Sequence, residues 1–177
     1  MSQPNPSGSG SDSDNAEAKL GRGMLYFGWL IALALLAFAF SGMEKSRHNP
    51  NSNLDLNGQK EVILKKNDYG HYIFTGLANG AEVDFLLDTG ASSVVFTEQQ
   101  ARELGLKKGL RHRVNTANGE ISVYTTQIDR LQIGPIVLRN VPAEINPHMD
   151  TEALLGMTAL GELEWSQSGD TLTIRQP

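Results

Sequence analysis

The stretch FLLDTGASSV, Phe85 to Val94, decides how the folded part of this chain is interpreted. Asp88 follows an apolar run that is typical of a buried strand, and Gly90 allows the backbone to turn sharply directly after it. Thr89 adds a hydroxyl that could bond to a neighbouring loop. A carboxylate in apolar surroundings is costly unless it is paired. The stretch therefore predicts a strand that delivers one carboxylate to a braced loop at its end.

This motif occurs once in the chain. Asp170-Thr171 is the nearest approach to a second copy, but Leu172 follows it where a glycine would be needed. Two carboxylates a few Å apart share a proton, so that one serves as a base while the other serves as an acid. We therefore expect the second carboxylate to come from a second chain, related to the first by a two-fold axis.

Composition excludes several other classes of protein. The chain has 177 residues, a formal net charge of −5 and no cysteine. A mildly acidic balance argues against nucleic acid as the main partner. The lack of cysteine excludes disulfides, thiolate nucleophiles and Cys-ligated metals. The four histidines are scattered without ligand spacing, so we expect no metal site and no cofactor.

The first third of the chain contains three segments of different composition. Residues 1–22 are rich in Ser, Asn, Gly and acids, and are expected to be disordered. Residues 23–43 contain no charged side chain and match the roughly 20 residues of a transmembrane helix. Residues 44–60 are polar and Asn-rich, and are expected to form a flexible stalk. The folded domain is expected over residues 61–177.

The apolar segment has two alternative interpretations. A buried soluble helix would have polar residues on one face, and this segment has none. A cleaved signal peptide is the stronger alternative, because Ala37–Ala39 resembles a cleavage site with small residues. We favour an uncleaved anchor, because a long leader containing acids precedes the segment. Lysine and arginine flank both ends equally, so charge does not give the orientation.

The pattern after residue 60 predicts an all-β domain, a small closed barrel-like fold with one or two short helices. Asn79-Gly80 and Asn118-Gly119 each lie between β-rich runs and predict tight hairpins. A further turn is expected at Gly134-Pro135. The best helix candidate begins at Thr97, which can cap it, and ends near Gly105.

The remaining segments give shorter signals. EVILKK, SVVFT and TLTIRQ are typical of strands, and two more strands are expected around Val137 and Val141. The middle of EALLGMTALGELEW, residues 152–165, is compatible with a helix.

Taken together, these features resemble the retropepsin-like aspartic proteases, the single-lobed relatives of pepsin found in retroviruses and in bacterial membrane-anchored proteins. The resemblance rests on LLDTGASSVVF at residues 86–96, the hairpin NTANGEISVYT at 115–125 and ALLGM at 153–157. It implies that Asp88 is catalytic. The residues implied to support the catalytic loop are Thr89, Gly90, Ala91 and Ser92. The flap over the substrate is implied at Thr116, Ala117, Asn118 and Gly119. The element behind the loop is implied at Leu154, Leu155 and Gly156.

The resemblance also implies a function. It is that of a membrane-anchored aspartic endopeptidase, a homodimer that cleaves an extended polypeptide with water held between two Asp88 carboxylates. It places the chain in a bacterial inner membrane, with a single pass and a periplasmic catalytic domain. The rival interpretation is a catalytically silent module of the same fold, which binds peptides or acts as a scaffold.

Overall fold

The computed structural model describes residues 11–57, 60–116 and 119–177. The chain divides into two compact units, Met1–Glu44 and Lys45–Pro177. Each unit is described by itself.

Helix α1, Ser11–His48, forms the described part of the first unit up to Glu44. Its residues from Lys45 onward belong to the second unit. The helix begins earlier than the sequence predicts, since residues 11–22 are helical and not disordered. Ala16, Glu17 and Ala18 are good helix formers, and extending an existing helix costs little compared with starting one. The expected disorder of residues 1–10 lies outside the described residues.

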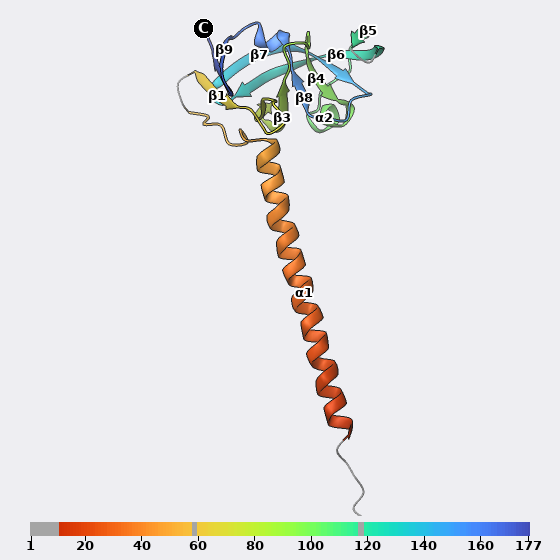
Figure 1. Ribbon diagram of the computed structural model, residues 1–177. Helices are drawn as coiled ribbons and strands as arrows, with labels where there is room; N and C mark the ends of the chain where they lie inside the picture. Colours follow the sequence, from red (N-terminus) through yellow and green to blue (C-terminus); the bar gives the residue numbers. More distant parts are fainter. Residues whose placement is uncertain (1–10, 58–59, 117–118) are drawn as a thin grey trace, which may run out of the picture. The chain divides into compact units, whose positions relative to one another are not determined.

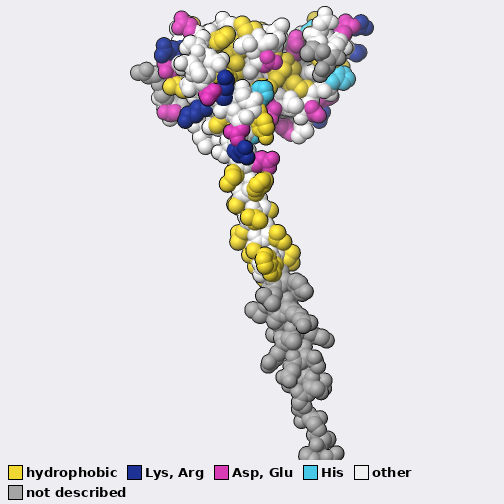
Figure 2. Space-filling model, viewed as in Figure 1, with side chains coloured by type: hydrophobic (Ala, Val, Ile, Leu, Met, Phe, Trp, Pro, Cys, Tyr) yellow, Lys and Arg dark blue, Asp and Glu magenta, His cyan; other side chains and the backbone are white. Residues whose placement is uncertain are grey.

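The apolar part of α1 is exposed over its whole circumference. Every residue from 27 to 47 is exposed, and Figure 2 shows hydrophobic side chains around this part of the helix. In the described part of the chain, Phe27–His48 is the one helix long and apolar enough to cross a membrane, with a mean hydropathy of 1.7. Such a surface is unfavourable in water and favourable in lipid.

The second unit is built on a closed barrel. Its sheet runs in the order β2-β3-β8-β4-β7-β6-β5, and an additional pairing of β2 with β6 closes six of these strands into a ring. Figure 1 shows β3, β8 and β4 near one another and the long strands β6 and β7 crossing the domain. This confirms the all-β, closed barrel-like fold. The strands of this sheet are β2 Ile73–Ala78, β3 Ala81–Leu87, β4 Val94–Thr97, β5 Arg111–Thr116, β6 Gly119–Ile133, β7 Ile136–Asn146 and β8 Ala153–Leu155.

The first hairpin has the turn that its sequence predicts. Strands β2 and β3 pair antiparallel, with Ala78 opposite Ala81. Asn79 and Gly80 between them have φ values of 51° and 89°. Positive φ at both central residues is the geometry that Asn-Gly favours in a two-residue hairpin. This turn sets the register of β3, and therefore the place where the chain reaches Asp88.

Helix α2, Glu98–Glu103, has the expected capping box. The Gln100 amide donates to the Thr97 hydroxyl oxygen, and the Gln100 side chain accepts from the Thr97 amide. Gly105, with φ of 66°, follows the end of the helix. These bonds satisfy two of the free donors at the helix start.

The C-terminal third differs from expectation in two places. The two strands expected around Val137 and Val141 are one strand, β7, although Asn140 has a positive φ of 55°. Pairing with β6 on both sides of Asn140 keeps the strand continuous. The segment compatible with a helix forms the short strand β8 and then helix α3, Met157–Leu160. β8 lies between β3 and β4, and this pairing overrides its helix propensity.

A separate three-stranded sheet joins the two ends of the domain. β1, Glu61–Lys65, and β9, Glu164–Ser168, both pair antiparallel with β10, Thr171–Arg175. The sequence pattern indicated β1 and β10. β9 gave no such signal, because all five of its residues are exposed.

Aromatic packing fixes the strand that carries the motif. The Phe85 ring stacks on Phe74, with centroids 5.7 Å apart, and meets Phe96 edge-on at 5.9 Å. All three side chains are fully buried. Aromatic pairs in these arrangements contribute beyond their buried area. Phe85 therefore anchors β3 three residues before Asp88.

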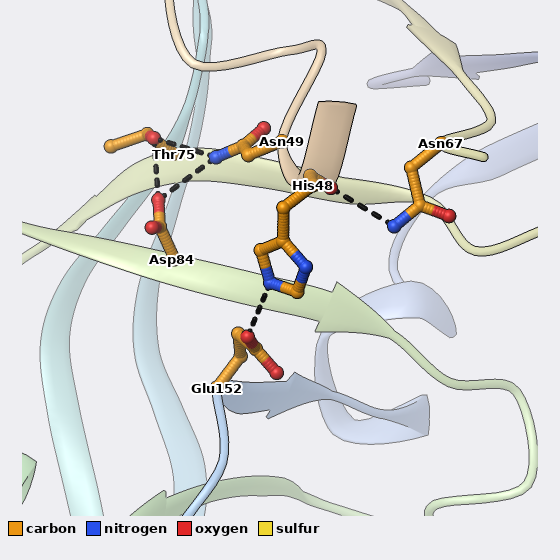
Figure 3. Close-up of polar contacts among 6 residues, drawn as sticks. All are labelled: His48, Asn49, Asn67, Thr75, Asp84 and Glu152. Carbon is orange, nitrogen blue, oxygen red and sulfur yellow. Dashed lines mark hydrogen bonds and ion pairs between the residues drawn. The ribbon is translucent and has the colours of Figure 1, made fainter. Parts of the chain in front are cut away.

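The segment expected to be a flexible stalk starts inside the folded domain. Asn49 and Asn51 are buried, and the Asn49 amide donates to the Thr75 hydroxyl and the Asp84 carboxylate (Figure 3). Just before it, His48 bonds to Glu152 at 2.6 Å. Buried polar side chains with several bonds are held in one place. The ordered domain therefore includes residues 48–51, well before the expected boundary at residue 61.

Candidate active site

Asp88 is the first residue after β3, at the start of a tight loop. Its Oδ1 accepts from the backbone N–H of Gly90 at 2.8 Å, and its carbonyl accepts from the Ala91 N–H at 3.2 Å. The side chain bends over its own loop in this way, and Asp88 is half-buried in the single chain. The other carboxylate oxygen has no protein donor among the described residues. It is therefore able to hold water or substrate.

The loop is braced from behind by the segment that joins β8 to α3. The Asp88 N–H donates to the Leu155 carbonyl at 3.1 Å, and the Met157 N–H donates to the Ala91 carbonyl at 2.9 Å. Leu155 is fully buried, and Leu154 lines the cleft beside Asp88. The predicted supporting element and the predicted catalytic loop are therefore in direct backbone contact.

Gly156 is the point of closest approach between these two segments. A Cβ placed on it would lie 2.2 Å from the Ser93 carbonyl oxygen and 2.6 Å from the Ala91 carbonyl oxygen. Both distances are far shorter than van der Waals contact, so no side chain fits here. Glycine is needed at this position for space, because its φ of −99° is available to any residue.

Thr158 also supports the loop and was not singled out from the sequence. Its hydroxyl accepts from the Val94 N–H at 2.9 Å, and its own N–H donates to the Ser92 carbonyl at 3.2 Å. A threonine at the start of a short helix gives no distinctive pattern in one sequence. Its role follows only from the proximity of α3 and the loop.

The other predicted loop residues lie at the surface of the single chain. Thr89 and Gly90 are exposed, and the Thr89 hydroxyl has no bonding partner among the described residues. Ala91 is half-buried, whereas Ser92 is exposed, and both line the cleft. The loop thus presents Asp88 and Thr89 outward.

A cleft of about 420 Å³ opens in front of Asp88. One wall comes from the catalytic loop and from Val95 on β4. The opposite wall comes from the β5–β6 hairpin, which contributes Val114 and Ile121. A mostly apolar cleft with a few polar groups is the usual form of a ligand site.

The predicted flap is the tip of the β5–β6 hairpin. Thr116 pairs with Gly119, and the Thr116 hydroxyl donates to the Gly119 carbonyl at 2.8 Å. Thr116 lines the cleft. Ala117 and Asn118, which were also predicted to belong to the flap, lie outside the described residues.

Sequence reasoning missed a polar pair at the base of this hairpin. His112 Nε2 lies 3.0 Å from Glu144 Oε1, and Glu144 lines the same cleft. The two residues are far apart in sequence and carry no shared motif. They meet because β6 pairs with β5 on one side and with β7 on the other.

Comparison with known proteins agrees with this geometry. The family model described as "gag-polyprotein putative aspartyl protease" matches residues 74–162, which is half of the chain and includes the loop, the hairpin and β8. The chain belongs to the retropepsin-like aspartic protease family. The resemblance inferred from the motifs is thereby confirmed.

A solved structure extends the match to the fold. A crystal structure of a retropepsin-like aspartic protease from Rickettsia conorii aligns with a TM-score of 0.58 and 27% sequence identity. The alignment covers 66% of this chain and 90% of that one.

Two curated relatives that match are described as uncharacterised proteins. One from Sinorhizobium sp. is 36% identical over 118 residues, covering 64% of this chain and 50% of its own length. One from Rickettsia prowazekii is 28% identical over 103 residues, covering 56% of this chain and 44% of its own length. The chain thus spans about half the length of the curated relatives it matches.

Proposed function

We propose that this retropepsin-like protein is an aspartic endopeptidase that works as a homodimer. The observation that carries the proposal is the presentation of Asp88. One carboxylate lies at the mouth of a peptide-sized cleft, on a loop held by backbone hydrogen bonds to Leu155 and Met157. Rigid support of this kind is what a group that acts on a reacting atom needs.

The second carboxylate is supplied by symmetry. Among the residues that line the cleft, Asp88 is the one carboxylate on the catalytic loop, and the chain contains a single Asp-Thr-Gly. The exposed Thr89 hydroxyl lies beside Asp88, where a second copy of the loop would meet it. A two-fold axis through this region brings two Asp88 side chains together.

The chemistry then needs no covalent intermediate. One Asp88 carboxylate takes a proton from a water held between the pair, and the oxygen of that water attacks the peptide carbonyl carbon. The protonated Asp88 gives its proton to the carbonyl oxygen, which forms the tetrahedral species. Collapse of that species breaks the C–N bond: the amine leaves with the proton that the first Asp88 took from water, and one hydroxyl of the diol returns a proton to the other Asp88 as the new carboxyl group forms. The hairpin tip at Thr116 and Gly119 covers the substrate and excludes water.

The substrate is an extended polypeptide. Strand β5, the last strand in the sheet order, contributes to a wall of the cleft, and an extended peptide can pair with the edge of this strand through its backbone. The side chains lining the cleft then set the sequence preference.

The apolar helix supports membrane anchoring. The exposed apolar surface of Phe27–His48 supports a single-pass anchor. The proposal of a bacterial inner membrane, with the domain on the periplasmic side, rests on the resemblance to bacterial membrane-anchored members of the family. Two chains held in one bilayer have a raised effective concentration, which favours a weak dimer. Because the chain has no cysteine, Ser168→Cys on exposed β9 gives a single thiol. Labelling by a membrane-impermeant maleimide in cells with a permeabilised outer membrane supports this topology, and labelling only after lysis contradicts it.

The decisive experiment for catalysis mixes Asp88→Asn with wild-type chain. Asp88→Asn alone should abolish peptide cleavage. If the protein is a silent binding module, the mutant and the wild type should give the same result in the cleavage assay. If both partners supply Asp88, an equal mixture of freely exchanging subunits retains about one quarter of the specific activity of the all-wild-type sample. A site complete in one chain would retain about half. Retention of half would contradict the shared site.

A further inference from the structure

Glu144 gives the cleft a second negative charge. Among the described residues that line the cleft, Asp88 and Glu144 are the only charged ones. The proposed mechanism uses Asp88 and leaves Glu144 without a role. A carboxylate in the wall of a substrate cleft is placed to select the charge of what enters.

The strand pattern directs Glu144 toward the cleft. On β7, Ala143 and Ile145 are buried in the core at 3% and 0% exposure. Alternate residues of a strand point to opposite faces, so Glu144 points away from the core. Its side chain is 18% exposed, which leaves the carboxylate largely shielded yet open to the cleft.

The contact with His112 leaves most of the carboxylate available. His112 Nε2 is 3.0 Å from Glu144 Oε1, and no other donor bonds Glu144 within the part of the chain that the structure describes. A carboxylate has about four acceptor sites. Nδ1 of the same imidazole is buried and has no partner among the described residues. His112 therefore reaches Glu144 through Nε2 alone, at one of the two carboxylate oxygens.

The surroundings of Glu144 define the matching ligand. The cleft walls carry Val95, Val123 and Leu154, which favour aliphatic contact. Lysine and arginine combine an aliphatic stem with a cationic end. We propose that Glu144 forms a subsite for a basic residue of the substrate peptide, with its stem on the apolar wall and its cation on the carboxylate.

This inference deepens the proposed function and rests on it. In a homodimer the two-fold axis repeats the subsite, so we expect a preference for a basic residue on each side of the cleaved bond. A purely structural role for the Glu144–His112 contact, as a tie between the flap base and the barrel, makes a different prediction. Loss of such a tie would slow cleavage of every peptide alike, whatever its charge.

The test uses the full chain in detergent micelles and a library of peptides. Each position near the cleaved bond carries Lys, Arg, norleucine, Gln or Glu in turn. We expect kcat/KM for Lys to exceed that for norleucine by at least about tenfold at the subsite, as a charge-assisted bond gives. Glu144→Gln should bring this ratio to within about twofold of one. Glu103→Gln, the same change on exposed α2 outside the cleft, should leave the ratio intact.

A binding measurement separates the subsite from catalysis. The Asp88→Asn chain is titrated with fluorescent Lys and norleucine peptides. Tighter binding of the Lys peptides supports the subsite even if the wild-type chain cleaves none of the peptides. Absence of cleavage by the wild type would contradict the protease proposal but not the subsite. Equal binding and equal kcat/KM for Lys and norleucine peptides at every position in the wild-type chain would overturn the subsite. It would also be overturned if the Lys-to-norleucine ratio of kcat/KM were unchanged in Glu144→Gln.

Discussion

Asn51 holds the first ordered residues of the domain in place, and its removal tests where the domain begins. Its amide NH₂ donates to the carbonyls of Lys65 and Ile73 at 2.9 and 2.8 Å, and its side-chain oxygen accepts from the Lys65 N–H at 2.8 Å. Asn51 is 7% exposed. Asn51→Ala would remove three hydrogen bonds and deprive backbone groups of two strands, one of them buried and two partly buried, of these partners.

The expected loss follows from these bonds. Each hydrogen bond contributes roughly 1 kcal/mol net, so we expect Asn51→Ala to lower the free energy of unfolding by about 3 kcal/mol. This is a large share of the roughly 5–15 kcal/mol that stabilises an ordinary domain. With a urea m-value of about 2 kcal/mol/M, the unfolding midpoint should fall by about 1.5 M.

The assay is urea unfolding of the full chain in detergent, followed by tryptophan fluorescence. The chain has two tryptophans, so a Trp29→Phe background leaves Trp165 on β9 as the reporter. Asn53→Ala is the matched control, because Asn53 is exposed and makes no side-chain hydrogen bond among the described residues. It should shift the unfolding free energy by less than about 0.5 kcal/mol. Equal midpoints for the two variants would refute the reasoning and restore the flexible stalk.

Two further predictions concern the loop support and a buried phenol. Gly156→Ala puts a Cβ 2.2 Å from the Ser93 carbonyl oxygen, so the segments must separate by about 1 Å. Cleavage should then fall by about 10²-fold in kcat/KM, with about 1–3 kcal/mol of destabilisation; wild-type activity would show that Gly156 does not position the loop. Burial, and secondarily Asp170, raise the pKa of the Tyr72 phenol above its ordinary 10.0. Because folding disfavours the ionised phenol, its contribution to stability is complete below about pH 10 and is lost as the pH rises through the folded-state pKa. The hydroxyl is buried without a partner among the described residues, so Tyr72→Phe should be neutral or stabilising by up to about 1 kcal/mol near pH 7. Denaturation midpoints from pH 7 to 11 should fall more steeply for the wild type, and parallel profiles would contradict the shifted pKa.

Features that depend on residues close together in the sequence could be predicted from the sequence alone. Asn79-Gly80 gives the first hairpin because few other residue pairs accept positive φ twice in succession. Thr97 and Gln100 give the start of α2, because the capping box is formed within one helical turn. The Asp88 loop could be recognised for the same reason, since its residues are contiguous and a glycine suits its turn.

The limits of that inference appear where non-local pairing decides. β8 has a helix-compatible sequence, yet it is a strand because β3 and β4 lie on either side of it. Asn49 and Asn51 have the composition of a stalk, yet they are buried because Thr75, Asp84, Lys65 and Ile73 offer them hydrogen bonds.

The family, the barrel-like class, the position of Asp88 and the apolar helix could all be inferred from the amino-acid sequence alone. Each of these depends on short-range signals such as periodicity, turn residues and one contiguous motif. The folded structure was needed to show how β2 and β6 close the barrel, why Gly156 admits no side chain, and that His112 and Glu144 meet at the cleft. These features depend on strand register across long stretches of chain, and register is set by the packing of the whole core.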